Sequence, residues 1–179
     1  MNKVAVFGKP GSGKSTLSKA LAEKTGLPLY QLDNLVYQAN GDLVPREIYD
    51  QAHADIVTSD AWIIDGFGPL GTFYQRLAVA DVLIYVDLAY PTSYWLVTKR
   101  LLKGLFVKPE GWPKGSSIIK GSWQSYKTLR RCPMFWNQDF HDKLQTYSAD
   151  KPVYVIKTLA ELKQFVKNYP ELNSRMSLK

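Results

Sequence analysis

The chain has 179 residues, with 45% hydrophobic and 22% charged side chains and a net charge of +7, values that fit one globular domain with a sizeable core. No apolar run approaches the roughly 20 residues of a membrane span, and the single cysteine, Cys132, excludes an internal disulfide. Because the first predicted strand begins almost at Met1 and free thiols suit a reducing compartment, we expect no targeting peptide and a cytoplasmic location.

The first two predicted elements are joined by a glycine-rich loop. Residues 3–7 (KVAVF) are short, apolar and β-branched, as in a buried strand, and residues 16–24 place apolar side chains at helical spacing. Between them, residues 8–16 (GKPGSGKST) fit G-x-x-x-x-G-K-[ST], the phosphate-binding P-loop, in the strand-to-helix context that this motif requires. The predicted nucleotide-binding residues are Gly8, Pro10, Gly11, Ser12, Gly13, Lys14, Ser15 and Thr16.

The chemistry of this loop follows from its backbone. Its glycines allow a tight turn and a close approach to phosphate. Successive N–H groups then form an anion site at the positive end of a helix dipole. We expect Lys14 to reach the β- and γ-phosphates of ATP as a catalytic residue, and the Ser15 hydroxyl to hold Mg²⁺.

The rest of the chain alternates between strands and helices. We expect strands at residues 28–33, 61–66, 81–87 and 152–156. Helices are expected at residues 46–59, 70–78, 92–102, 137–148 and 159–168, with another from 118 or 123 to 131. Pro170 is expected to end the last helix. This alternation is typical of βαβ units, so the predicted fold class is α/β with a parallel sheet.

Acidic residues follow three of the predicted strands, at the sheet edge where ligands of parallel α/β proteins bind. A P-loop needs a carboxylate that orients hydrated Mg²⁺. We favour Asp65, since Gly66 keeps the backbone open after it, whereas Asp87 could serve instead or cap the next helix. Asp33 is placed to accept a proton from an attacking hydroxyl or to bind the acceptor, the alternative being a simple turn or N-cap residue.

Basic residues suggest where anionic groups would bind. Arg46 begins one predicted helix, and Arg76 lies on the helix that follows Asp65. Each could hold an anionic acceptor or lie on a solvated surface. Between residues 99 and 131 the chain carries nine basic residues and one acid, so this segment holds the whole positive excess. We predict a lid-like excursion at about residues 103–125 of a single domain spanning 1–179. Arg100, Arg130 and Arg131 at its hinges would neutralise charge on the transferred phosphoryl group, the alternative being a solvated basic face.

Aromatic side chains crowd the same region. They could stack on a base, but core or lid packing is favoured; they are Trp95, Trp112, Trp123, Tyr126, Phe135 and Trp136. His53 and His141 lack metal-like spacing to another ligand, so both are expected to be structural.

Together, the N-terminal P-loop, Leu32-Asp33, residues 62–66 (WIIDG) and the basic segment resemble adenylate-kinase-like P-loop kinases, and most closely the DNA topology modulation proteins. The resemblance covers about residues 1–170. It implies a P-loop NTPase fold with a five-stranded parallel sheet of order 2-3-1-4-5, a lid over ATP, Mg²⁺, and γ-phosphoryl transfer to a small acceptor. Adenylate kinases continue their Asp-Gly-Phe motif with Pro-Arg, whereas Gly68-Pro69 follows here, which argues against AMP as the acceptor.

The sequence therefore favours an ATP-dependent phosphotransferase acting on a nucleotide or another small molecule. The alternative is a nucleotide-dependent protein that binds DNA through the basic segment without kinase turnover. A plain nucleoside triphosphatase is disfavoured, because lid-bearing folds exclude water.

Overall fold

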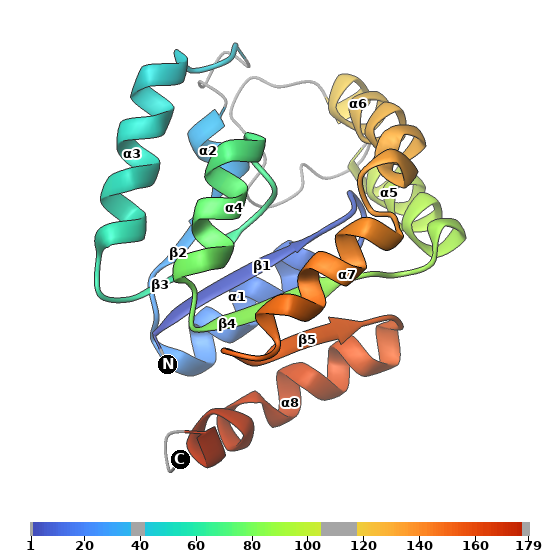
Figure 1. Ribbon diagram of the computed structural model, residues 1–179. Coiled ribbons are helices and arrows are strands. Elements are labelled where there is room, and N and C mark those ends of the chain that lie inside the picture. The colour runs from blue at the N-terminus through green and yellow to red at the C-terminus, as the bar shows by residue number, and fades with distance from the viewer. Residues whose placement is uncertain (1, 37–41, 105–117, 177–179) are drawn as a thin grey trace.

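A computed structural model describes residues 2–36, 42–104 and 118–176 of the chain. Five parallel strands form one sheet in the order β2-β3-β1-β4-β5, which confirms the expected architecture (Figure 1). The strands are β1 (Lys3–Gly8), β2 (Leu29–Gln31), β3 (Trp62–Asp65), β4 (Val82–Val86) and β5 (Val153–Ile156).

Helices connect and cover these strands. They are α1 (Lys14–Thr25), α2 (Leu32–Val36), α3 (Arg46–Thr58), α4 (Leu70–Val79), α5 (Tyr90–Gly104), α6 (Ile118–Arg131), α7 (Gln138–Tyr147) and α8 (Leu159–Met176), with a short 3₁₀ turn, η1, at Cys132–Met134. Helices α5 and α6 lie side by side at one end of the sheet (Figure 1).

The two faces of the sheet have different cores. Strand β1 alternates strictly: Ala5 and Phe7 enter one core, while Val4 and Val6 enter the other. The first core is rich in aromatic side chains and is covered by α3, α4 and α7, and the second is mainly aliphatic and is covered by α1 and α8. Burial of both faces explains why the strands are almost continuously apolar.

Strand register brings the loops after β1, β3 and β4 to the same edge. Val6 is paired with Asp65 of β3, and Gly8 is paired with Val86 of β4. In parallel strands the carboxyl ends coincide, so the P-loop, Asp65 and Asp87 lie at this edge.

Two sequence expectations need correction. Asp33 does not end a strand, because β2 stops at Gln31 and Asp33 lies in the first turn of the short helix α2. Helix α8 continues through Pro170 to Met176. Its buried residues Leu162 and Tyr169 lie two turns apart on the face packed against α1, and burial of this face offsets the cost of one proline.

The predicted excursion at 103–125 is only partly within the described residues. Residues 103–104 end α5 and residues 118–125 belong to α6, which takes the earlier of the two expected starts. Residues 105–117 lie outside the described part of the chain, so the lid itself stays a prediction.

Candidate active site

The P-loop presents backbone donors to an anion. Gly13 is the N-cap of α1 with φ of 83°, a left-handed conformation that glycine adopts without strain. It provides no side-chain cap, and the first turn of α1 contains no acidic residue. The N–H groups at this helix end are therefore left for an external anion such as phosphate.

Lys14 is held beside this cradle. Its Nζ donates to the carbonyl oxygen of Lys9 at 3.1 Å, and the Ser12 N–H donates to the same oxygen at 3.3 Å. These two hydrogen bonds tie the second half of the loop to Lys9 in its first half. They also keep the ammonium group of Lys14 next to the N–H groups at the start of α1. The motif alone predicts that Lys14 lies at the phosphate-binding loop.

Asp65 lies at the end of β3, only 4% exposed. Burial raises the pKa of its carboxyl group, while the charge of Lys14 and a hydrogen bond with Ser15 act in the opposite direction. Its Oδ1 is buried and has no hydrogen-bond partner among the described residues. A buried carboxylate oxygen left open beside a lysine and a P-loop serine fits a cation held by Ser15 and Asp65.

Gln31 is a neighbour that the sequence did not indicate. It pairs with Asp65 in the register of β2 and β3, and its side chain hydrogen-bonds the Asp65 carboxyl group and helps to lower the pKa of that group. A glutamine two residues before the expected site acid Asp33 gives no motif signal, so only strand pairing reveals it.

Asp87 is neither a helix cap nor the open carboxylate of this edge. Its Oδ1 accepts from Lys9 Nζ in an ion pair and from the Tyr85 hydroxyl at 3.0 Å. The expectation that favoured Asp65 over Asp87 is therefore consistent with the contacts: Asp65 faces Lys14 and Ser15, whereas Asp87 is occupied by the buried side chain of Lys9. Lys9 occupies a position where the motif accepts any residue, so no pattern in the sequence pointed to this ion pair.

The charges of Asp33 in α2 and Arg100 in α5 act on each other. Burial lowers the pKa of the Arg100 guanidinium, and the charge of Asp33 is the first influence that opposes this shift. Asp33 also raises the pKa of Asp65, an effect smaller than those of burial, Lys14 and Ser15. Arg100 Nη2 donates to the Ser125 hydroxyl at 2.8 Å, which ties α5 to α6. Helix α5 thus brings one cation close enough to Asp33 for their charges to interact.

The other predicted lid cations lie further out. Arg130 and Arg131 are exposed in the last turn of α6. Their proposed movement towards phosphate depends on a lid that falls outside the described residues, so their role stays a prediction.

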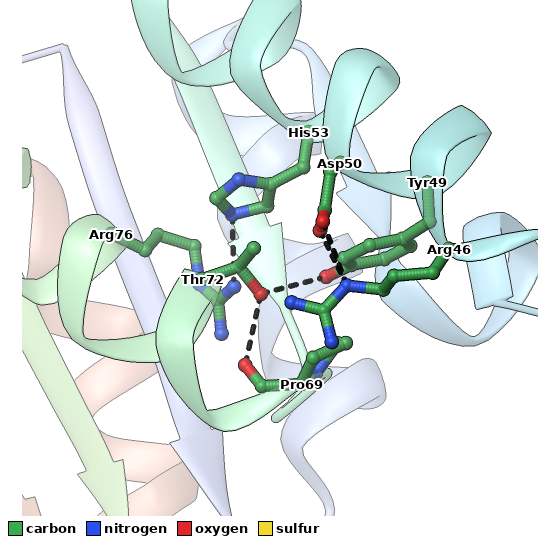
Figure 2. A network of polar contacts seen from close by, with 7 residues as sticks. All are labelled: Arg46, Tyr49, Asp50, His53, Pro69, Thr72 and Arg76. Carbon is green, nitrogen blue, oxygen red and sulfur yellow. Dashed lines mark hydrogen bonds and ion pairs between the residues drawn. The ribbon is translucent and has the colours of Figure 1, made fainter.

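On the acceptor side, Arg46 and Arg76 have different surroundings (Figure 2). Arg46 begins α3, and its half-exposed side chain forms an i,i+4 ion pair with Asp50 at 2.8 Å. Such exposed pairs are weak, so the guanidinium of Arg46 can turn to an anionic ligand at little cost.

Arg76 is the clearest departure from expectation. The side chain is 1% exposed, and Nη2 donates to the carbonyl oxygens of Gly66 at 3.0 Å and Phe67 at 2.9 Å. Nη1 lies 3.2 Å from His53 Nε2 (Figure 2). With its donors used inside the protein, Arg76 supports the loop after Asp65 and does not project towards an acceptor.

The aromatic residues divide into two groups. Phe135 and Trp136 pack in the aromatic core, where the Trp136 ring stacks on Tyr85 with centroids 5.1 Å apart. Tyr126 stacks on Tyr94 between α5 and α6. Packing, the favoured interpretation, therefore holds for these three. Trp95 and Trp123 are more than half exposed, and Trp112 lies outside the described residues.

The two histidines have structural surroundings. His53 is 1% exposed beside Arg76, and His141 Nε2 lies 3.8 Å from Asp87 Oδ2. Within the described part of the chain there is no group of three or more His, Cys, Asp and Glu side chains that could hold a metal ion. Across residues 2–36, 42–104 and 118–176, no helix combines the length and apolar character needed to cross a membrane.

The chain has the fold of a P-loop kinase. It superposes on shikimate kinase from Acinetobacter baumannii with a TM-score of 0.59 and 13% sequence identity, covering 100% of this chain and 96% of that protein. At this identity the likeness concerns the fold alone.

Sequence comparison gives shorter matches to small-molecule and nucleotide kinases. The chain is 30% identical over 114 residues to the shikimate kinase of Chlamydia pneumoniae, which covers 54% of this chain and 65% of the relative. It is 49% identical over 45 residues to the adenylate kinase of Thermococcus kodakarensis, or 25% of this chain and 16% of the relative. The chain thus spans less than two thirds of the length of each, and no family model matches it.

Proposed function

We propose that this protein is an ATP-dependent phosphotransferase that transfers the γ-phosphoryl group of ATP to a hydroxyl group of a small acceptor. The observation that carries the proposal is the meeting of Lys14, Ser15 and a buried Asp65 with an open Oδ1 at the edge of a P-loop kinase fold. The kinase activity of the sequence relatives agrees with it.

In this proposal, each residue has a distinct task. The N–H groups at the start of α1 and the ammonium group of Lys14 bind the phosphates of ATP and stabilise the charge that develops during transfer. Ser15 and Asp65 hold Mg²⁺, which when bound would neutralise phosphate charge. Asp33 orients the acceptor hydroxyl and accepts its proton, and Arg46 binds an anionic group of the acceptor. Arg100, Arg130 and Arg131 approach the transferred group from the lid side.

The acceptor we propose therefore carries both a hydroxyl group and a negative charge. The missing Pro-Arg after Phe67 and the burial of Arg76 disfavour AMP, because no arginine of that loop is available for its phosphate. Shikimate belongs among the candidates, since two sequence relatives are shikimate kinases. The relation to DNA topology modulation proteins and the cytoplasmic location stay predictions.

The test is ADP release from Mg·ATP in the presence of separate acceptors: nucleoside monophosphates, nucleosides, small sugars and shikimate. We expect one acceptor to stimulate release at least about tenfold over the acceptor-free rate, the scale of a productive ternary complex. Slow release that no acceptor changes would contradict the proposal.

A nucleic-acid-binding function is the second candidate. Helices α5 and α6 contain no acidic residue, and Trp95 and Trp123 are exposed with Lys99 and Lys127 placed over their rings. Exposed aromatic rings among cations can bind single-stranded nucleic acid by stacking and charge. This function predicts DNA binding that weakens steeply with salt and is lost in the double variant Trp95→Ala/Trp123→Ala. Absence of binding at low salt would exclude it.

A further inference from the structure

Lys9, the second residue of the P-loop, is buried although its side chain carries a charge. The residue is 3% exposed, its Nζ forms an ion pair with Asp87 Oδ1, and the Tyr90 ring centroid lies 4.7 Å from the same nitrogen. Burying an ammonium group is costly unless a partner compensates it. A lysine at a position where the motif accepts any residue therefore needs a reason that the motif does not supply.

Its partner is fixed from several directions. The Tyr85 hydroxyl donates to the same Oδ1 of Asp87 at 3.0 Å, and His141 Nε2 lies 3.8 Å from Oδ2. The Asp87 N–H donates to the Ile156 carbonyl oxygen of β5 at 2.8 Å. Residues of β4, β5 and α7 thus hold Asp87 in place. Its carboxylate therefore provides a fixed partner for the side chain of Lys9.

The backbone of Lys9 faces the phosphate cradle. Its carbonyl oxygen accepts from Lys14 Nζ at 3.1 Å and from the Ser12 N–H at 3.3 Å. The side chain of Lys9 is therefore fastened to the sheet, while its main chain orients the lysine that reaches the nucleotide and closes the turn of the loop.

We propose that Lys9, held by Asp87, is a positioning residue for nucleotide binding. The ion pair fixes the first half of the P-loop, so that Lys14 and the N–H groups of the loop are pre-arranged before ATP arrives. Lys9 does not touch the phosphates in this role; it acts through the loop backbone. The inference rests on the proposed function, because it assumes that the loop binds a nucleoside triphosphate.

The experiment uses three variants of the full chain: Lys9→Met, Asp87→Asn and the double variant. Affinity is measured by titration with a fluorescent ATP analogue, and stability by urea unfolding of the same samples. In Lys9→Met the partly buried carboxylate of Asp87 loses its cationic partner, so both stability and affinity should fall. In the double variant no buried charge is left unpaired, so stability should recover. Affinity should stay about 10- to 100-fold weaker than in the unchanged protein, because the loop remains untethered.

A purely structural role makes the opposite prediction for the double variant. If the ion pair only stabilised the fold, affinity would return together with stability, and the proposal would be overturned. Wild-type affinity in a folded Lys9→Met protein would overturn it as well. If Lys9→Met does not fold, the comparison rests on Asp87→Asn and the double variant. Unchanged affinity for the ATP analogue in both variants would overturn the proposal. Weakened affinity in both would support it.

Lys3→Met is the matched control. Lys3 lies at the other end of β1, and its Nζ donates to the Val57 carbonyl oxygen at 3.1 Å. This substitution removes a partly buried lysine at the start of β1 without touching the loop that follows the strand, so affinity should be unchanged. Failure of the unchanged protein to bind the ATP analogue would instead contradict the proposed function, and this inference with it.

Discussion

Arg76 and His53 share a buried contact, with Nη1 of the arginine 3.2 Å from Nε2 of the histidine. Since the guanidinium can only donate, the histidine nitrogen accepts, and the ring is neutral. Burial, and then the charge of Arg76, lower the pKa of His53 to about 4. One contact between α3 and α4 thus links the loop after Asp65 to a group that resists protonation.

This contact predicts a loss of stability in mild acid. An unfolded histidine binds a proton below pH of about 6.5, whereas folded His53 does so only near pH of about 4, so the unfolded state binds more protons between these values. The free energy of unfolding should be fully retained above pH of about 6.5 and decline by up to about 3 kcal/mol as the pH falls to about 4. Urea unfolding across this range measures it.

The variant His53→Gln provides the comparison. Its amide oxygen can accept from Arg76 but does not titrate, so the part of the pH dependence between about 4 and 6.5 that belongs to His53 should disappear. An unchanged slope in this variant would show that other groups cause the acid sensitivity.

Arg76→Met should destabilise the protein strongly. The substitution leaves the buried carbonyl oxygens of Gly66 and Phe67 without their donor, and we expect the free energy of unfolding to fall by about 2–4 kcal/mol. Arg46→Met removes the same side chain from an exposed i,i+4 pair and should cost less than about 0.5 kcal/mol. Urea unfolding compares the two, and equal effects would contradict the structural role of Arg76.

Lys14→Ala should abolish most turnover while leaving the fold intact. Its ammonium group forms a hydrogen bond with the loop itself, through Lys9, and we expect kcat to fall by about 10²–10³-fold or more, the loss found when a charge-stabilising donor is removed. Lys24→Ala, in the last turn of the same helix, should leave kcat unchanged. Circular dichroism checks the fold, and a Lys14→Ala protein with normal turnover would contradict the proposed function.

Asp65→Asn should separate stability from activity. Because burial raises the pKa of this carboxyl group, its charged form is costly in the folded protein, and the neutral amide should raise the melting temperature in the absence of nucleotide and Mg²⁺. The rise should be about 2–4 °C for each kcal/mol gained. Mg²⁺-dependent turnover should fall at the same time.

Asp87→Asn is the contrasting substitution at the neighbouring strand. It weakens an ion pair that compensates a buried lysine, so its melting temperature should fall. A calorimetric scan of both variants distinguishes the two acids. A fall in the melting temperature of Asp65→Asn would contradict the view that burial of this carboxylate is only partly compensated by its neighbours.

Much of the fold could be predicted from the sequence because it depends on local patterns. The apolar strands, the helical spacing after Gly13 and the P-loop motif each describe neighbouring residues, and strands alternating with helices leave few topologies for a parallel sheet. Asp65 could be placed at the site for the same reason, since a buried strand followed by glycine is readable in the chain.

The tertiary structure decided which charged side chains remain available. Arg76 and Asp87 look in the sequence like any arginine on a helix or any acid after a strand, yet one is used by His53 and two carbonyl oxygens and the other by Lys9. Asp33, predicted at the end of a strand, lies in the first turn of α2. The sequence determined where backbone elements and the phosphate loop lie, because these follow from residues close in the chain. The partner of a buried charge depends on residues brought together from distant segments, and only the packed fold specifies them.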